Sequence, residues 1–125
     1  MQITISSPDV DPTVVAVRGQ LDIDTASTFD AAFEQVGVAV AARVVVDLGG
    51  LEFCDSTGLS TVVLAHRRCT SAGGWLRLGA PSTFLIRLLI TVGVAGVIPM
   101  YRTVDGARRG DPTDLIPVGR AGHAA

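Results

Sequence analysis

Apolar and polar residues alternate at the beginning of the chain, in two short segments. The segments are Gln2 to Ser6 and Thr13 to Arg18, and their period of two predicts two strands. The residues between them read Ser-Pro-Asp-Val-Asp-Pro, which is a turn-forming composition. We therefore expect an antiparallel hairpin.

Three later segments repeat their apolar residues with helical spacing. Asp24 or Thr25 can cap the first, the second begins near Thr57, and the third begins at Pro81 and Ser82 with Gly93 as its stop. The first helix is expected to bury Phe29, Phe33 and Val36, and the second Leu59, Val62, Val63 and His66. The third is expected to bury Leu85, Leu88, Leu89 and Val92.

Three further strands are expected between and after these helices. Residues Arg43 to Leu48 include three consecutive valines, which is typical of a central strand buried on both faces, and the pair Gly49-Gly50 should end it. The other strands are expected at residues 75–80 and 97–102. Strands that alternate with helices after a hairpin predict a single α/β domain with a mixed central sheet and helices packed on it.

Length, charge and hydropathy narrow the class of protein. The 125 residues fit one domain, placed here at residues 1–109, with 110–125 as a flexible C-terminal tail of weak periodicity. A net charge of −2 argues against direct nucleic-acid binding. The apolar run from Phe84 to Met100 is interrupted by Arg87 and is too short for a membrane span. With no signal peptide visible, we expect a cytoplasmic protein.

The cysteines and histidines indicate neither a disulfide nor a metal site. Cys54 and Cys69 would lie roughly 18 Å apart along the second helix, beyond disulfide reach. Their spacing relative to His66 and His123 fits no zinc pattern. We expect no cofactor.

The turn Asp55-Ser56-Thr57-Gly58 allows two interpretations. Asp and Ser are good helix N-caps, so the turn can be purely structural. It also resembles a nucleophile elbow, but Cys54 replaces the first glycine of that motif. His66 would lie two to three turns away along the helix, roughly 15 Å from Ser56, so it cannot serve as the base. An enzyme is therefore not expected. The functional interpretation that remains is a serine that another protein modifies.

A phosphate on Ser56 would be compatible with the fold. A helix N-terminus carries partial positive charge and unpaired N–H groups, so it tolerates the added −1.5 to −2 charges. A partner docked over the same turn would tolerate them poorly, because like charges at an interface cost several kcal/mol. One phosphate there would act as a binding switch. Spacing alone leaves Thr57 open as a second acceptor.

The segment "VVVDLGGLEFCDSTGLSTVV" resembles the signature of STAS domains, and more narrowly that of bacterial anti-sigma factor antagonists. The matching residues are Asp47, Leu48, Leu51, Phe53, Asp55, Ser56, Thr57, Gly58 and Leu59. The earlier "GQLDIDTA", residues 19–26, is similar to a second motif of that family. The likeness extends from about Ile3 to Ala107. Cys54 stands where a larger apolar residue is usual.

The resemblance implies a partner switch. Unphosphorylated, such a protein binds an anti-sigma factor that is also a serine kinase, and a sigma factor is released. The kinase phosphorylates the serine at position 56 with its own ATP, and a serine phosphatase reverses the reaction. The implied partner-binding residues are Asp22, Asp24, Asp55, Ser56, Thr57 and Gly58. The alternative is an unphosphorylated STAS module that acts as a scaffold, or as a nucleotide- or lipid-binding domain, in a larger assembly.

Overall fold

The first two strands form the antiparallel hairpin that the alternation predicts. The computed structural model describes residues 2–5, 12–36 and 43–117. Strand β1 (Gln2–Ile5) pairs with β2 (Thr13–Leu21), with Gln2 opposite Arg18. The turn expected between the strands lies outside the described residues. β2 continues to Leu21, three residues beyond the predicted end.

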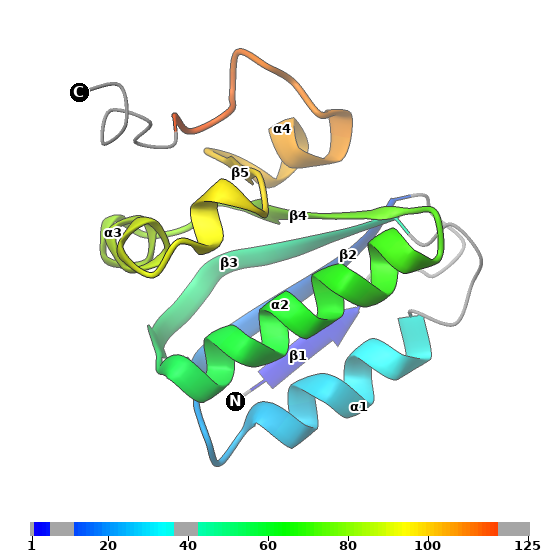
Figure 1. The fold of residues 1–125 in the computed structure, drawn as a ribbon, viewed down its shortest axis with the longest axis vertical. Helices are drawn as coiled ribbons and strands as arrows, with labels where there is room; N and C mark the ends of the chain where they lie inside the picture. Colours follow the sequence, from blue (N-terminus) through cyan, green and yellow to red (C-terminus); the bar gives the residue numbers. More distant parts are fainter. Residues whose placement is uncertain (1, 6–11, 37–42, 118–125) are drawn as a thin grey trace.

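The sheet is mixed, with its strands in chain order. β3 (Arg43–Cys54), β4 (Trp75–Gly79) and β5 (Met100–Tyr101) continue from β2 in parallel, in the order β1-β2-β3-β4-β5. β3 is the central strand, as predicted, and its three valines are fully buried. The α/β fold class with a mixed sheet and an opening hairpin is confirmed (Figure 1).

The prediction that Gly49-Gly50 ends the third strand is wrong. β3 continues to Cys54, because β2 also extends and pairs with it as far as Leu21 opposite Cys54. Gly50 permits this pairing, since a Cβ there would come within 2.9 Å of the Arg18 side chain. The residues after Leu48 are therefore strand, and the predicted loop shrinks to a tight turn at Asp55.

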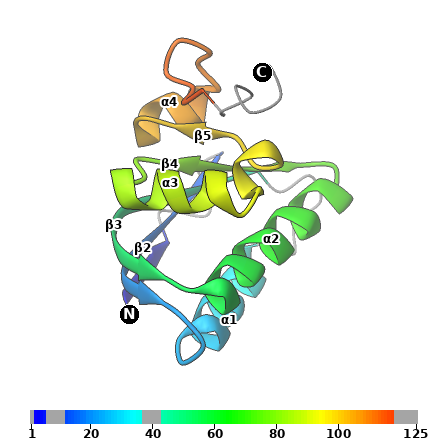
Figure 2. The same cartoon turned by 60° about the vertical axis from the view of Figure 1, so that its left-hand side comes forward.

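Three helices lie together against one face of the sheet (Figures 1 and 2). They are α1 (Ala26–Val36), α2 (Ser56–Ser71) and α3 (Thr83–Thr91), and a short 3-10 helix, η1 (Val94–Gly96), follows α3. Their buried side chains share one core with Val44 and Val46 of β3, whereas Val45 packs with Tyr101 and Ala107 on the other face. The alternation within β3 thus divides the core into two layers.

The buried helix faces differ in part from those expected. In α2, Leu59 and Val62 are buried as predicted, but Ala65 and Cys69 continue the face while His66 is half-buried. In α3 the expected burial of Val92 is wrong: its side chain is 49% exposed. The reason is that α3 ends at Thr91, so Val92 is the C-cap, and Gly93 follows with φ of 84° as the predicted stop.

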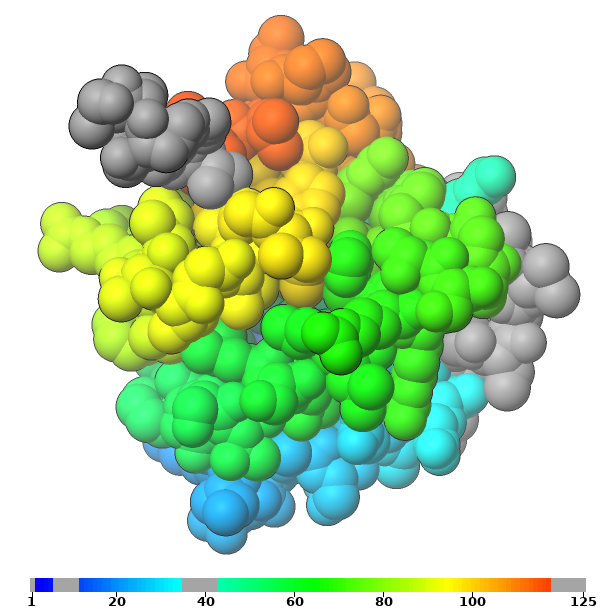
Figure 3. Space-filling view, viewed as in Figure 1, coloured from blue at the N-terminus to red at the C-terminus, as the bar shows by residue number. Residues whose placement is uncertain are grey.

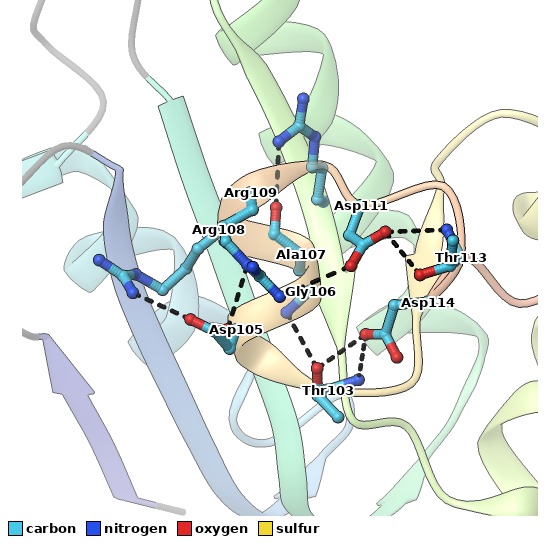
Figure 4. Close-up of polar contacts among 10 residues, drawn as sticks. Thr103, Asp105, Gly106, Ala107, Arg108, Arg109, Asp111, Thr113 and Asp114 are labelled. Carbon is cyan, nitrogen blue, oxygen red and sulfur yellow. Dashed lines mark hydrogen bonds and ion pairs between the residues drawn. The ribbon is translucent and has the colours of Figure 1, made fainter.

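The last strand is shorter than predicted, because the turn that follows η1 occupies residues 97–99. After β5, helix α4 (Val104–Arg109) is capped by Thr103, whose hydroxyl accepts a hydrogen bond from the Gly106 amide at 2.9 Å. Asp114 accepts from the Thr103 amide and hydroxyl (Figure 4). The Ile116 amide donates to Met100 O at 2.8 Å. Residues 111–116, expected to be tail, are therefore attached to the edge of the sheet.

Candidate functional site

Two turns meet where β2 and β3 end beside each other. Leu21 is the partner of Cys54 in the sheet, so residues 22–25 and the turn at Asp55 leave the same edge. The Asp55 amide donates to the Leu21 carbonyl at 3.2 Å. The sequence places these segments more than 30 positions apart, and the strand register brings them together.

Asp55 connects both turns through its carboxylate. One oxygen, Oδ1, caps α2 by accepting from the Gly58 amide at 2.9 Å, and Oδ2 accepts from the Ile23 amide at 3.2 Å. Its extended backbone, with φ of −103°, is usual for an N-cap. The structural interpretation of Asp55 as a cap is therefore correct, and the carboxylate also fixes the neighbouring turn.

Gly58 is required by close packing against β2. A Cβ at this position would overlap the carbonyl of Leu21 and approach the Cys54 sulfur to 3.0 Å. Gly58 is buried, so its contribution to the site is to bring the start of α2 against the end of β2. Cys54 itself is buried beneath the turn.

Ser56 is the exposed hydroxyl of the turn. It is the first residue of α2 and its side chain faces solvent, whereas Thr57 is half-buried. Among the described residues, the amides of Ser56 and Thr57 have no hydrogen-bond acceptor, because the first bonds of the helix go to Gly58 and Leu59. These two donors and the helix dipole can receive a phosphate on Ser56.

The two acids of the neighbouring turn have different roles. Thr25, one of the two expected caps, directly precedes α1, and its carbonyl accepts from the Phe29 amide at 3.2 Å. Asp22 supports it, because its carboxylate accepts from the Asp24 amide at 3.0 Å and the Thr25 amide at 3.2 Å. The Thr25 hydroxyl in turn accepts a hydrogen bond from the Asp22 amide at 2.9 Å. Asp24 is exposed, and its carboxylate accepts no hydrogen bond from any described residue. Of the predicted partner-binding acids, Asp24 is the one most open to solvent.

Two exposed apolar residues at the ends of β2 and β3 were missed as site residues. Ile23 is 71% exposed, and Phe53 is 43% exposed at the end of β3. The Asp55 carboxylate holds the Ile23 backbone, so the apolar side chain stands beside the Ser56 turn. A signal for Ile23 was present, since it is an apolar residue between two acids in a turn-forming segment.

Cys54 below the turn and His66 further along α2 are poorly suited to catalysis. Burial, with the charges of Asp55 and Asp22, raises the pKa of the Cys54 thiol to about 11. Burial and Arg67 lower the pKa of His66, and its Nδ1 is buried without a hydrogen-bond partner among the described residues. The described residues hold no cluster of His, Cys, Asp or Glu that could bind a metal ion.

Comparison with known proteins identifies the family. The family model described as "Mlab, STAS domain" matches residues 6–100. This chain belongs to the STAS-domain family. The predicted resemblance is thus confirmed over most of the chain, including both turns of the site. No helix among the described residues is both long and apolar enough to cross a membrane.

Solved STAS structures share this architecture. An anti-sigma factor antagonist from Mycobacterium paratuberculosis is 29% identical with a TM-score of 0.69, covering 87% of this chain and 93% of that one. An anti-sigma-factor antagonist (STAS) domain protein from Planctomyces limnophilus is 22% identical with a TM-score of 0.74, over 86% and 96%. The phosphorylated form of the Bacillus cell fate determinant SpoIIAA is 17% identical with a TM-score of 0.66, over 87% and 99%. No curated protein sequence matches the chain.

Proposed function

We propose that this STAS protein is an anti-sigma factor antagonist whose binding is switched by phosphorylation of Ser56. The observation that carries the proposal is the position of Ser56: an exposed hydroxyl at the first residue of α2, directly after the Asp55 cap. The Mycobacterium relative, which is itself an anti-sigma factor antagonist, supports the same function. The partner is an anti-sigma factor that is also a serine kinase, and a serine phosphatase resets the protein.

The surroundings of Ser56 explain why a phosphate would release the partner. Ile23 and Phe53 provide exposed apolar area at the same edge of the sheet, and Asp24 and Asp55 provide negative charge. A phosphate within an apolar contact and next to carboxylates is destabilising, through desolvation and like-charge repulsion. The fold itself is unaffected, because the free amides at the start of α2 receive the charge.

Phosphorylation at Ser56 can be tested directly with the protein and its kinase. We expect wild type to incorporate one phosphate from ATP when incubated with anti-sigma factor kinases of the source organism, with mass spectrometry placing it on Ser56. Ser56→Ala should remove the incorporation, whereas Thr57→Ala and Ser60→Ala should retain it. Ser60 is the matched control, because it is an exposed serine one turn further along the same helix.

The binding switch is tested with the same variants as bait in a native lysate. We expect a small ATP-binding kinase to be captured by wild type and Ser56→Ala and to be lost with Ser56→Asp. Identical companions on all three baits would contradict the switch. That result would favour the alternative, a STAS module that acts as a scaffold or ligand-binding domain without phosphorylation.

A further inference from the structure

A groove extends along α2 from the phosphorylatable turn. Its walls are α2 and the segment from Val92 to Val94, its volume is about 580 Å³, and Ser56 lies on its rim. A second, shallower hollow, wide open to solvent, shares Leu64 and Arg67 with the first and continues to Ala72. Figure 3 shows the green surface of α2 beside the yellow surface of the η1 segment on this face. The two hollows together follow nearly the whole length of α2.

The groove exposes large apolar side chains to solvent. Of the residues that line the groove, Leu64 is 41% exposed and Val92 is 49% exposed. α3 buries only Leu85 and Leu89, although six of its nine residues, all except Arg87 and the threonines at its ends, are apolar. Contiguous apolar area of this kind marks an interaction surface.

Arg67 defines the charge that the occupant must carry. It is exposed, it lines both hollows, and it forms no ion pair with any described residue. Its neighbour Arg68 is engaged, since its guanidinium lies 4.0 Å from the Asp30 carboxylate. An occupant that covers Arg67 would desolvate a positive charge, so it needs a carboxylate to pair with it.

The backbone chemistry of the walls selects a helical occupant. The backbone of α2 is helical, so this wall of the groove offers no strand edge to an extended peptide. β1 and β5 are the edge strands of the described sheet, and neither lines the groove. A helix brings its own hydrogen bonds and presents apolar side chains at i, i+3, i+4 and i+7.

We propose that the groove binds an amphipathic α-helix of the anti-sigma factor kinase, with an acidic side chain placed opposite Arg67. The inference rests on the proposed function, and it names the surface through which the partner docks. Ser56 and Arg67 are separated by about 16 Å along the helix axis, roughly twice the Debye length at physiological salt. A phosphate on Ser56 therefore repels the bound helix at the Ser56 end of the groove, and it does not screen the attraction between Arg67 and the acidic side chain.

The test measures, by isothermal titration calorimetry, the affinities of purified anti-sigma factor kinases of the source organism for wild type, for Ser56→Asp and for four groove and control variants. Arg67→Glu and Val92→Asp should each weaken binding about tenfold or more. Arg67→Lys should recover most of the loss. Arg102→Glu is the matched control, an exposed arginine beyond β5 and outside the groove, and it should bind as wild type does. Circular dichroism confirms that each variant is folded.

The outcomes separate the groove from the switch. If wild type binds a kinase, Ser56→Asp does not, and Arg67→Glu and Val92→Asp bind like wild type, the groove assignment is overturned and the proposed function stands. If no kinase binds wild type, the proposed function and the groove assignment both fall. Loss of binding by both groove variants, with Arg102→Glu unchanged, supports the docked helix.

Discussion

At the scale of single residues, the site depends on how closely the start of α2 approaches β2. Gly58→Ala places a methyl group against the Leu21 carbonyl, so we expect the free energy of unfolding to fall by about 1–3 kcal/mol. Gly96→Ala is the matched control, because nothing lies within 4 Å of a Cβ there, and it should change stability little. Urea denaturation measures both. If both substitutions lowered the free energy of unfolding equally, the close contact between Gly58 and Leu21 would not be the cause.

Asp55 contributes to stability through both of its carboxylate oxygens. Asp55→Ala removes the cap on the Gly58 amide and the bond to the Ile23 amide, and we expect a loss of about 1–2 kcal/mol. Asp24→Ala, an exposed acid in the adjoining turn, should stay within about 0.5 kcal/mol of wild type. A loss from Asp24→Ala as large as that from Asp55→Ala would contradict these roles.

The sequence predicts individual residues best where their role is local. The capping role of Asp55 and the stop at Gly93 follow from chemistry within a few positions, and both are observed. The bond from the Ile23 amide to Asp55 spans 32 positions and depends on strand register, which local patterns do not specify. The same register makes Gly58 essential, a role that its position in a turn motif does not reveal.

At the scale of elements, hydrophobic periodicity predicts which elements exist more reliably than where they end. Helices α1, α2 and α3 and the strands before them occur where the pattern places them. β3 continues through Gly49-Gly50 because its neighbour β2 supplies hydrogen-bond partners that outweigh the local cost of glycine. The face of α2 shifts toward Ala65 and Cys69 because the sheet below it, rather than the helix alone, decides which side is covered.

The start of α4 is stabilised by Asp114, a residue that follows the helix in the chain. Asp114 accepts hydrogen bonds of 2.9 and 2.7 Å from the Thr103 amide and hydroxyl, and Thr103 caps α4 (Figure 4). We expect Asp114→Ala to reduce the free energy of unfolding by about 1.5–3 kcal/mol. Asp105→Ala removes only exposed ion pairs with Arg108 and Arg109 and should cost at most about 1 kcal/mol. Thermal denaturation of the two variants distinguishes them.

At the scale of the whole molecule, the fold buries both thiols, and this couples stability to alkaline pH. Burial raises the pKa of Cys54 and of Cys69 to about 11, from 9.0. Because the folded pKa is the higher, this contribution is complete below about pH 9 and is lost as pH rises from 9 toward 11. We expect the double variant Cys54→Ala/Cys69→Ala to lose less stability than wild type between pH 8 and pH 11. Parallel losses would contradict the thiol linkage.

The same burial predicts that the native thiols are unreactive at neutral pH. A thiol-specific reagent at pH 7.4 should label Cys54 and Cys69 slowly in the folded protein and completely in urea, because only the thiolate reacts. Both thiols are therefore inaccessible in the native fold, whereas the Ser56 hydroxyl is exposed. Fast labelling of the native protein would contradict this.

The central claim is that a phosphate on Ser56 switches the partner without disturbing the fold. The most direct measurement is the affinity of the cognate anti-sigma factor kinase for the unphosphorylated chain and for the chain phosphorylated at Ser56, by calorimetry under identical conditions. The account predicts binding at least about a hundredfold weaker after phosphorylation, which is about 2.8 kcal/mol, with an unchanged free energy of unfolding. Equal affinities for the two forms would contradict it, and Ser56 would then be only the first residue of a capped helix.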